Sequence, residues 1–181
     1  MNSVYIKRME VITDLKDLYI TQLIYIKEGV QLSDLNTDIA TNTSNVLDVF
    51  LENKIRKKIG GKCMNVGYID KNSIKVVSRS IGKMNTSHFN GEIYYQVQVE
   101  CKVCKPVPNQ VIETKIVGKN KIGILCISGP LQIIIPSSHH EDASFYNSLN
   151  KDDTILVKII NYKFQLNDDN IKVIGEFVSK K

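Results

Sequence analysis

Apolar residues recur every three or four positions in one segment of the chain, a spacing typical of a helix that packs on one face. The segment is residues 45–61, and five apolar side chains repeat within it: Leu47, Phe50, Leu51, Ile55 and Ile59. Thr43 or Ser44 can cap its start, and Gly60-Gly61 is a typical helix end. The pattern therefore predicts one amphipathic helix in this part of the chain.

After this helix the apolar residues recur at every second position, which is the period of a strand with one buried face. Three runs with this period are predicted as strands: 63–69, 73–81 and 92–103. Residues 17–30, ahead of the helix, are predicted as a further strand. In the third run the apolar members are Val97, Val99, Cys101 and Val103.

That run ends in a Cys101-x-x-Cys104 pair, the spacing of a zinc knuckle. The strand alternation puts Cys101 on the buried face and Cys104 on the opposite one. Two strand residues three apart lie roughly 10 Å from each other, whereas zinc–sulfur bonds of about 2.3 Å require the two thiolates to converge. Cys63 and Cys126 stand alone in the sequence. We therefore predict buried free thiols and no metal site.

Pro106 and Pro108 end the strand, because proline cannot donate to a sheet ladder. Five further strand-like runs follow: 110–118, 121–128, 131–136, 153–166 and 170–178. The long connection among them, residues 137–151, comes after the third run, which is the strand plan of an OB barrel. We predict an α+β chain, with an N-terminal domain in residues 1–105 and a five-stranded OB-type β-barrel in residues 106–181.

Composition narrows the class of protein. Of 181 residues, 43% are hydrophobic and 24% charged, which is ordinary for a globular protein. The longest apolar run, residues 131–136, is too short to span a bilayer, and no secretory leader opens the sequence. We therefore expect no membrane contact, and a cytosolic or nuclear protein with reduced cysteines.

The net charge of +5 comes mainly from lysine. A mild lysine excess fits weak contact with nucleic-acid phosphates and fits plain solubility equally well. Four basic residues crowd the last turns of the predicted helix, where they oppose the negative end of the helix dipole: Lys54, Arg56, Lys57 and Lys58. A solvated helix end is favoured over a contact patch for them.

Few residues suggest catalysis. His139-His140 and Glu141-Asp142 are residue types that bind metals or transfer protons, but adjacent loop residues seldom converge on one ion, so a solvated loop is favoured. The sequence contains no nucleophile elbow, phosphate loop or dinucleotide-binding motif. We predict no enzyme, no catalytic residue and no cofactor.

Two groups of residues in the predicted barrel suit contact with single-stranded RNA. Lys119, Asn120 and Lys121 form a polar, basic loop beside the second strand. The second group lies on the fourth strand: Lys158, Tyr162 and Lys163. Barrels of this type bind single strands with a basic groove and aromatic stacking platforms. These six residues are our predicted RNA-contact set.

Short motifs along the chain occur in the order of a known family. They are Gly61-Lys62-Cys63, Gly67-Tyr68-Ile69, Ile81-Gly82, the proline joint, Asn120-Lys121-Ile122-Gly123, Gly129-Pro130 and Val173-Ile174-Gly175. In this series, from about residue 18 to about residue 178, the chain resembles the larger stalk subunit of multisubunit RNA polymerases, which is the seventh subunit of eukaryotic polymerase II and its archaeal counterpart. The family pairs an RNP-like tip domain with an OB-type RNA-binding barrel.

The resemblance implies a non-catalytic polymerase subunit. Its docking residues would be Gly61, Gly67, Ile81, Gly82 and Lys83, since family members insert the loop that matches Ile81-Gly82 into a pocket at the base of the polymerase clamp. The implied partners are the largest core subunits and nascent single-stranded RNA, and a smaller stalk subunit is left open. The family often has an aromatic residue after the glycine that matches Gly123. This chain has Ile124-Leu125 there, so we expect weak RNA binding that depends mainly on phosphate contacts. Replacing Ile124 with Phe should tighten RNA binding if the new ring restores a stacking platform.

Isoleucine, asparagine and lysine are abundant, which suggests a low-GC genome. A nucleocytoplasmic large DNA virus is therefore the expected source, with the protein in the host cytoplasm, at the viral factory, and in the virion. A protist is the other candidate source, with the protein in the nucleus. The alternative function is a free-standing protein of translation-factor type that binds single-stranded RNA through its OB barrel.

Overall fold

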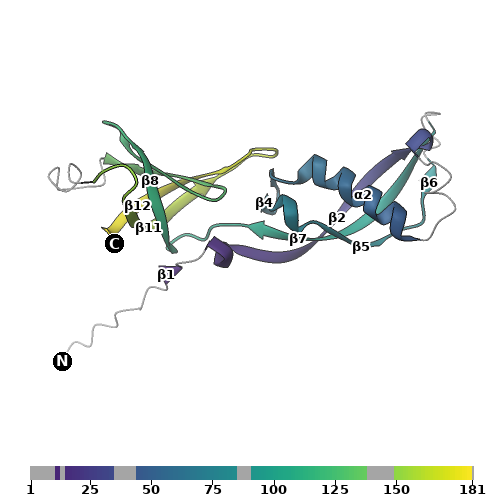
Figure 1. The fold of residues 1–181 in the computed structure, drawn as a ribbon, viewed down its shortest axis with the longest axis horizontal. Helices are drawn as coiled ribbons and strands as arrows, with labels where there is room; N and C mark the ends of the chain where they lie inside the picture. The colour runs from purple at the N-terminus through teal and green to yellow at the C-terminus, as the bar shows by residue number, and fades with distance from the viewer. Residues whose placement is uncertain (1–10, 13–14, 35–43, 85–90, 138–148, 181) are drawn as a thin grey trace, which may run out of the picture.

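The computed structural model describes residues 11–12, 15–34, 44–84, 91–137 and 149–180. Within these ranges the chain is mostly β, with one α-helix, and its strands form two six-stranded sheets. Figure 1 shows an elongated molecule with the C-terminal strands at one end and the helix-bearing sheet at the other.

The N-terminal sheet is built on two long antiparallel strands, β2 (Tyr19–Gln31) and β7 (Glu92–Cys104), which pair over their whole length. The other edge of β7 pairs with short strands. These are β4 (Gly67–Ile69), β5 (Lys75–Arg79) and β6 (Lys83–Met84), and β4 also pairs with β3 (Cys63–Met64). Three 3₁₀ turns complete this part: η1 (Leu15–Leu18), η2 (Leu32–Asp34) and η3 (Lys71–Ser73).

The predicted helix is present as α2 (Ser44–Ile59), and its apolar stripe packs on one face of this sheet. Leu47, Leu51, Ile55 and Ile59 are buried, and Phe50 is partly buried. On the sheet side the partners are Val97, Val99, Cys101 and Val103, the apolar positions predicted from the alternation of β7. Full burial of each such side chain contributes about 1.5–3 kcal/mol, so this contact stabilises the N-terminal part.

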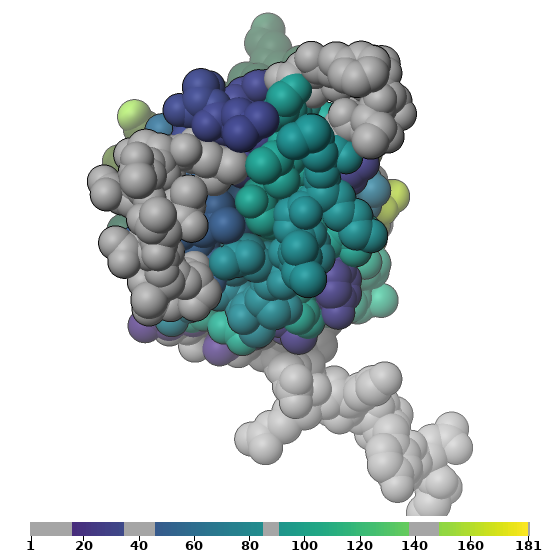
Figure 2. Space-filling model, turned by 90° about the vertical axis from the view of Figure 1, so that its right-hand side faces the viewer, coloured from purple at the N-terminus to yellow at the C-terminus, as the bar shows by residue number. Residues whose placement is uncertain are grey.

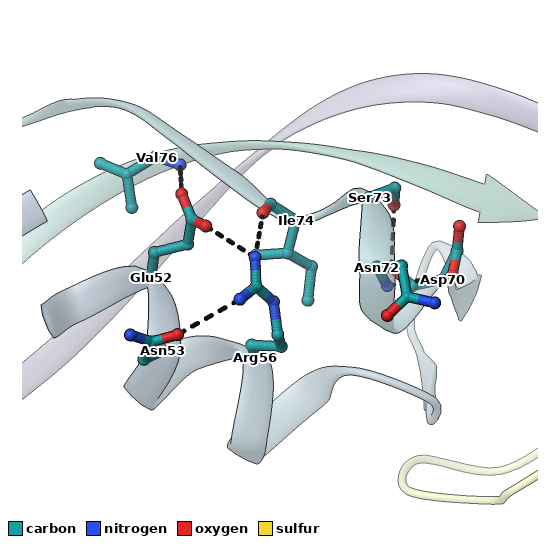
Figure 3. A network of polar contacts seen from close by, with 8 residues as sticks. All are labelled: Glu52, Asn53, Arg56, Asp70, Asn72, Ser73, Ile74 and Val76. Carbon is teal, nitrogen blue, oxygen red and sulfur yellow. Dashed lines mark hydrogen bonds and ion pairs between the residues drawn. The ribbon is translucent and has the colours of Figure 1, made fainter. Parts of the chain in front are cut away.

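Polar contacts set the position of α2 along the sheet (Figure 3). The Glu52 carboxylate accepts hydrogen bonds from the Val76 N–H, at 3.2 Å, and from the Arg56 guanidinium, at 2.6 Å. Arg56 also donates to the Ile74 carbonyl, at 3.2 Å. At the far end of the helix, Lys58 pairs at 2.8 Å with the buried carboxylate of Glu28 on β2. Arg56 and Lys58 therefore hold the helix against its own sheet, beyond the solvated role expected for the helix end.

The C-terminal strands form a closed five-stranded barrel, as predicted from the sequence. The strands are β8 (Val111–Lys119), β9 (Gly123–Ser128), β10 (Leu131–Pro136), β11 (Thr154–Lys163) and β12 (Ile171–Lys180). Around the barrel the order is β8, β9, β10, β12, β11 and back to β8. All neighbours are antiparallel except β10 and β12, which run parallel.

A short strand from the beginning of the chain completes one edge of the barrel. β1 (Val11–Ile12) runs parallel to β8 and pairs with Val111 and Ile112. β9 pairs with β8 only from Lys115 onward, so β1 takes the part of that edge that β9 leaves open. The sequence patterns did not predict this strand.

The barrel and the N-terminal sheet meet at the hairpin that joins β11 to β12. Figure 1 shows this hairpin reaching toward β4. The Cys63 N–H donates to the Asp168 carbonyl, at 2.7 Å, and the Asn167 N–H donates back to the Cys63 carbonyl, at 2.8 Å. Leu18, Cys63 and Cys104 are buried in the same apolar cluster as the barrel interior. The two halves are thus held together by buried apolar contacts as well as by the chain; the division at residues 105 and 106 stays a prediction.

Candidate interaction surfaces

The loop between β5 and β6 carries two of the predicted docking residues, Ile81 and Gly82, and the third, Lys83, begins β6. Before the loop, the Arg79 guanidinium pairs at 2.6 Å with Asp48 of α2 and lies over the ring of Tyr95. The Ser80 N–H donates to the Gln96 carbonyl, at 2.8 Å, and the Gln96 N–H donates to the Ser80 hydroxyl, at 3.0 Å. The loop is therefore anchored at its first residues.

Within this anchored loop one large apolar side chain projects into solvent. Ile81 is 86% exposed, and Met84 of β6 is 61% exposed. Gly82 lies against the sheet: a Cβ there would come within 2.6 Å of Ile93 Cγ2 and 2.9 Å of the Tyr95 ring. The backbone at Gly82 thus approaches β7 closely, and Ile81 stands away from it. An exposed aliphatic side chain on a fixed loop is suited to insertion into a partner's pocket.

The two other predicted docking residues, Gly61 and Gly67, have roles in folding. Gly61 follows α2 with φ +77°, a left-handed conformation that favours glycine at a helix end. Gly67 has φ +136°, and a Cβ there would lie 2.6 Å from the Cys104 carbonyl oxygen. Gly61 thus ends the helix, and Gly67 permits the close fit of the β3–β4 hairpin to β7.

The structure does not bring all five docking residues together. Lys83 pairs with Tyr94 near the start of β7, whereas Tyr68, next to Gly67, pairs with Cys104 at its end. Ten residues of strand at about 3.3 Å each separate these positions by roughly 33 Å. Ile81, Gly82 and Lys83 form one surface, and Gly61 and Gly67 lie beside the barrel.

The six predicted RNA-contact residues also fall into two groups. The first group is the turn between β8 and β9. The Asn120 side chain accepts hydrogen bonds from the Ile122 N–H, at 2.9 Å, and the Gly123 N–H, at 3.0 Å, so it shapes the turn. Lys119 donates to the Leu149 carbonyl, at 3.1 Å, and Lys121 is exposed.

The second group lies nearer the other end of the barrel. Lys158 pairs with Val111, eight residues before Lys119 on β8, which is roughly 26 Å of strand. Its ammonium lies 4.0 Å from the Glu176 carboxylate. Tyr162 is half-buried and stacks on Phe164, with ring centroids 6.3 Å apart, and both rings pack on the barrel cluster. Lys163 is exposed. The six residues therefore do not line one continuous groove.

The expectation that a phenylalanine at position 124 could offer a stacking platform to RNA is wrong. Ile124 is fully buried in the barrel interior, where its strand neighbour in β10 is the buried Ile135. The neighbouring Leu125 faces outward and is partly exposed. A phenylalanine at position 124 would therefore enter the core and would not offer a stacking surface to RNA.

All four cysteines are buried free thiols, as predicted. Cys101 belongs to the cluster under α2 and Cys104 to the barrel cluster, so the two lie on opposite faces of β7. Burial raises the pKa of the Cys104 thiol to about 12, that of Cys126 to about 12 and that of Cys63 to about 11. The protonated thiol is the form that these sites favour, whereas metal binding requires the thiolate.

Among the described residues, no group of three or more histidine, cysteine, aspartate or glutamate side chains is placed to hold a metal ion. The His139-His140 and Glu141-Asp142 segment lies outside those residues. No helix in the described ranges is both long and apolar enough to cross a membrane.

Sequence reasoning did not single out Arg79 and Asp48, which anchor the exposed loop. The available signal was the scarcity of arginine: the chain has only Arg8, Arg56 and Arg79 in a lysine-rich composition. Arg56 and Arg79 both form ion pairs at 2.6 Å in the structure. Arginine is suited to such fixed pairs because its planar fork matches a carboxylate.

Comparison with known proteins agrees with the class that the motifs indicated, at the level of a polymerase subunit. No protein-family model matches the chain. The chain is 26% identical over 162 residues to a protein of Acanthamoeba polyphaga mimivirus named "Putative DNA-directed RNA polymerase subunit L376". The alignment covers 82% of this chain and 78% of that protein. This similarity supports a role in a viral DNA-directed RNA polymerase.

Proposed function

We propose that the chain is a non-catalytic stalk subunit of a DNA-directed RNA polymerase. The observation that carries the polymerase assignment is the similarity to the mimivirus protein over 82% of the chain. The order of the motifs, from the helix end at Gly61 to the last strand at Gly175, supports the stalk family within that class. In this proposal the division into two domains falls between β7 and β8.

The loop at Ile81 is the proposed anchor on the core polymerase, at the base of its clamp. An isoleucine that is 86% exposed gains free energy when a partner covers it, about 1.5–3 kcal/mol for full burial. The ion pair of Arg79 with Asp48 and the hydrogen bonds of Ser80 hold the loop in place beforehand, so little ordering entropy opposes docking. In the proposal this N-terminal sheet with its single helix is the RNP-like tip domain.

The barrel is proposed to be of the OB type and to contact exiting RNA weakly. Its strand order, with β12 between β10 and β11, and the long connection after β10 support the OB assignment. Lys121 and Lys163 are exposed cations at separate ends of the barrel, which suits scattered phosphate contacts more than a single deep groove. The proposed site of action is the host cytoplasm, with packaging in the virion.

The test measures binding of the full chain to core polymerase purified without it. Ile81→Asp removes the apolar contact and forces a carboxylate toward an apolar pocket, so affinity should fall at least about a hundredfold, since each 1.4 kcal/mol is tenfold. Ile122→Asp is the matched control, because Ile122 is 77% exposed on the barrel, away from the loop. The control should bind like the unmodified chain.

Equal binding by Ile81→Asp would place the anchor elsewhere. A chain that elutes alone from polymerase at high salt, while binding single-stranded RNA, would favour the free-standing RNA-binding protein instead.

A further inference from the structure

A pocket of about 310 Å³ lies beside the exposed loop, at the end of the N-terminal sheet. It is lined by Lys27, Ser80, Lys83, Met84, Tyr94, Tyr95 and Gln96. Lys27 is opposite Gln96 and Lys83 is opposite Tyr94, so these four residues share the sheet face turned away from α2, whereas Tyr95 belongs to the apolar cluster on the α2 side. Figure 2 views the molecule from this end, with the teal surface around β6 toward the reader.

The pocket is positively charged. The Lys27 ammonium lies over the Tyr94 ring, 4.5 Å from its centroid, and Lys83 faces the same tyrosine from the neighbouring strand. None of the described residues that line the pocket carries a carboxylate. The Glu92 carboxylate, close by on β7, accepts the hydrogen bond of the Tyr94 hydroxyl, at 2.5 Å, which fixes the ring. Two lysines and no carboxylate among the described lining residues make the pocket suited to an anion.

The surroundings favour a protein carboxylate over a phosphate of nucleic acid. Met84, which is 61% exposed, lines the pocket, and Ile81, which is 86% exposed, lies in the loop between the lining residues Ser80 and Lys83. A phosphate backbone offers nothing to bury such side chains, whereas protein interfaces combine an apolar centre with a charged rim. A volume of about 310 Å³ leaves ample room for one carboxylate side chain.

We infer that this pocket receives an aspartate or glutamate side chain of the core polymerase, next to the apolar contact made by Ile81. The inference rests on the proposed docking function and adds the chemistry of the partner surface: an apolar hollow with an acidic residue at its edge. Docking is then steered by charge and depends on ionic strength.

The first experiment measures association rates of the full chain with core polymerase over a series of salt concentrations. Lys27→Gln with Lys83→Gln should associate about tenfold more slowly than the unmodified chain at low salt, and the two rates should converge at high salt, because charges at an interface act mainly on the association rate and are screened by salt. The matched control is Lys75→Gln with Lys102→Gln, which removes the same charge from exposed lysines on the same sheet face, away from the pocket. Its rate should stay within about twofold of the unmodified chain.

The second experiment identifies the anion directly by zero-length cross-linking of the complex with a carbodiimide. The reagent activates a carboxyl group, the lysine Nζ attacks it, and an amide forms as the reagent leaves as a urea. Peptide mapping should find Lys27 or Lys83 joined to an aspartate or glutamate of a core subunit. Cross-links that involve only lysines outside the pocket would overturn the inference.

The outcomes separate this inference from the function on which it rests. If the unmodified chain binds core polymerase and Ile81→Asp abolishes binding, but both lysine double variants behave alike, the docking proposal stands and the acidic partner is refuted. If Lys27→Gln with Lys83→Gln loses affinity for single-stranded RNA and keeps its polymerase association rate, the pocket is a nucleic-acid site and the inference is wrong. If the unmodified chain does not bind core polymerase, both are refuted.

Discussion

Replacing Ile124 with Phe distinguishes a barrel interior from an RNA-binding surface at the same position. Ile124 is fully buried opposite Ile135 and belongs to one buried cluster with Ile116, Cys126 and Ile135. A phenyl ring is larger than the isoleucine side chain, and forcing extra volume into a packed core costs about 1–3 kcal/mol. The substitution should therefore destabilise the barrel.

The size of the effect can be expressed as a melting temperature. A domain of 150–250 residues loses about 2–4 °C per kcal/mol, so Ile124→Phe should lower the melting temperature by roughly 2–12 °C. Leu125→Phe is the matched control. Leu125 faces outward and pairs with Gly118, where a Cβ would meet no atom within 4 Å, so the larger ring has room. Its melting temperature should stay within about 2 °C of the unmodified chain.

The assay is thermal unfolding followed by circular dichroism, together with fluorescence anisotropy of a short labelled RNA. Ile124→Phe should melt early and bind RNA no more tightly than the unmodified chain. If Ile124→Phe melts normally and binds RNA about 1–3 kcal/mol more tightly, as an added stacking platform would, the inward orientation of Ile124 is refuted.

Two further predictions concern titration and charge. The unfolded thiols ionise near pH 8.5, whereas the buried thiols of Cys63, Cys104 and Cys126 have pKa values of about 11, 12 and 12, so the free energy of unfolding should fall as pH rises from about 8.5 toward 11. Urea unfolding in reductant at pH 7.5 and 9.5 checks this, and equal stability at both would contradict the burial of the thiols. In RNA binding, each phosphate contact adds about −0.7 to the log–log salt slope for single strands, so Lys121→Ala should flatten the slope by about 0.7. An unchanged slope in the anisotropy titration would place the RNA contact away from this turn.

The sequence alone determined the elements that have a one-sided apolar pattern. In residues 45–61 and in β7 one face is apolar and the other polar, so the period reports both the type of element and its buried face. The helix that contains Leu51 and Ile55 and the burial of Cys101 were predicted for this reason. Burial on one face of a single element is a local property of the chain.

The orientation of β9 could not be determined in this way. Ile122, Ile124 and Cys126 alternate with Leu125 and Ile127, so both faces of this strand are apolar in sequence. The alternation of side chains along a strand shows which residues share a face but not which face points inward. A shift of the strand pairing by one position exchanges the inward and outward faces. Only closure of the barrel, with β9 between β8 and β10, decided that Ile124 is inside.

The candidate sites depended still more on tertiary structure. The motifs placed Gly67 and Ile81 in one docking set, yet their strands pair with opposite ends of β7. The pocket at Lys27 joins residues from β2, β6 and β7. More than fifty residues of sequence separate the end of β2 from the start of β6. Strand pairing over such separations is set by the packing of the whole sheet, and no local pattern in the sequence records it.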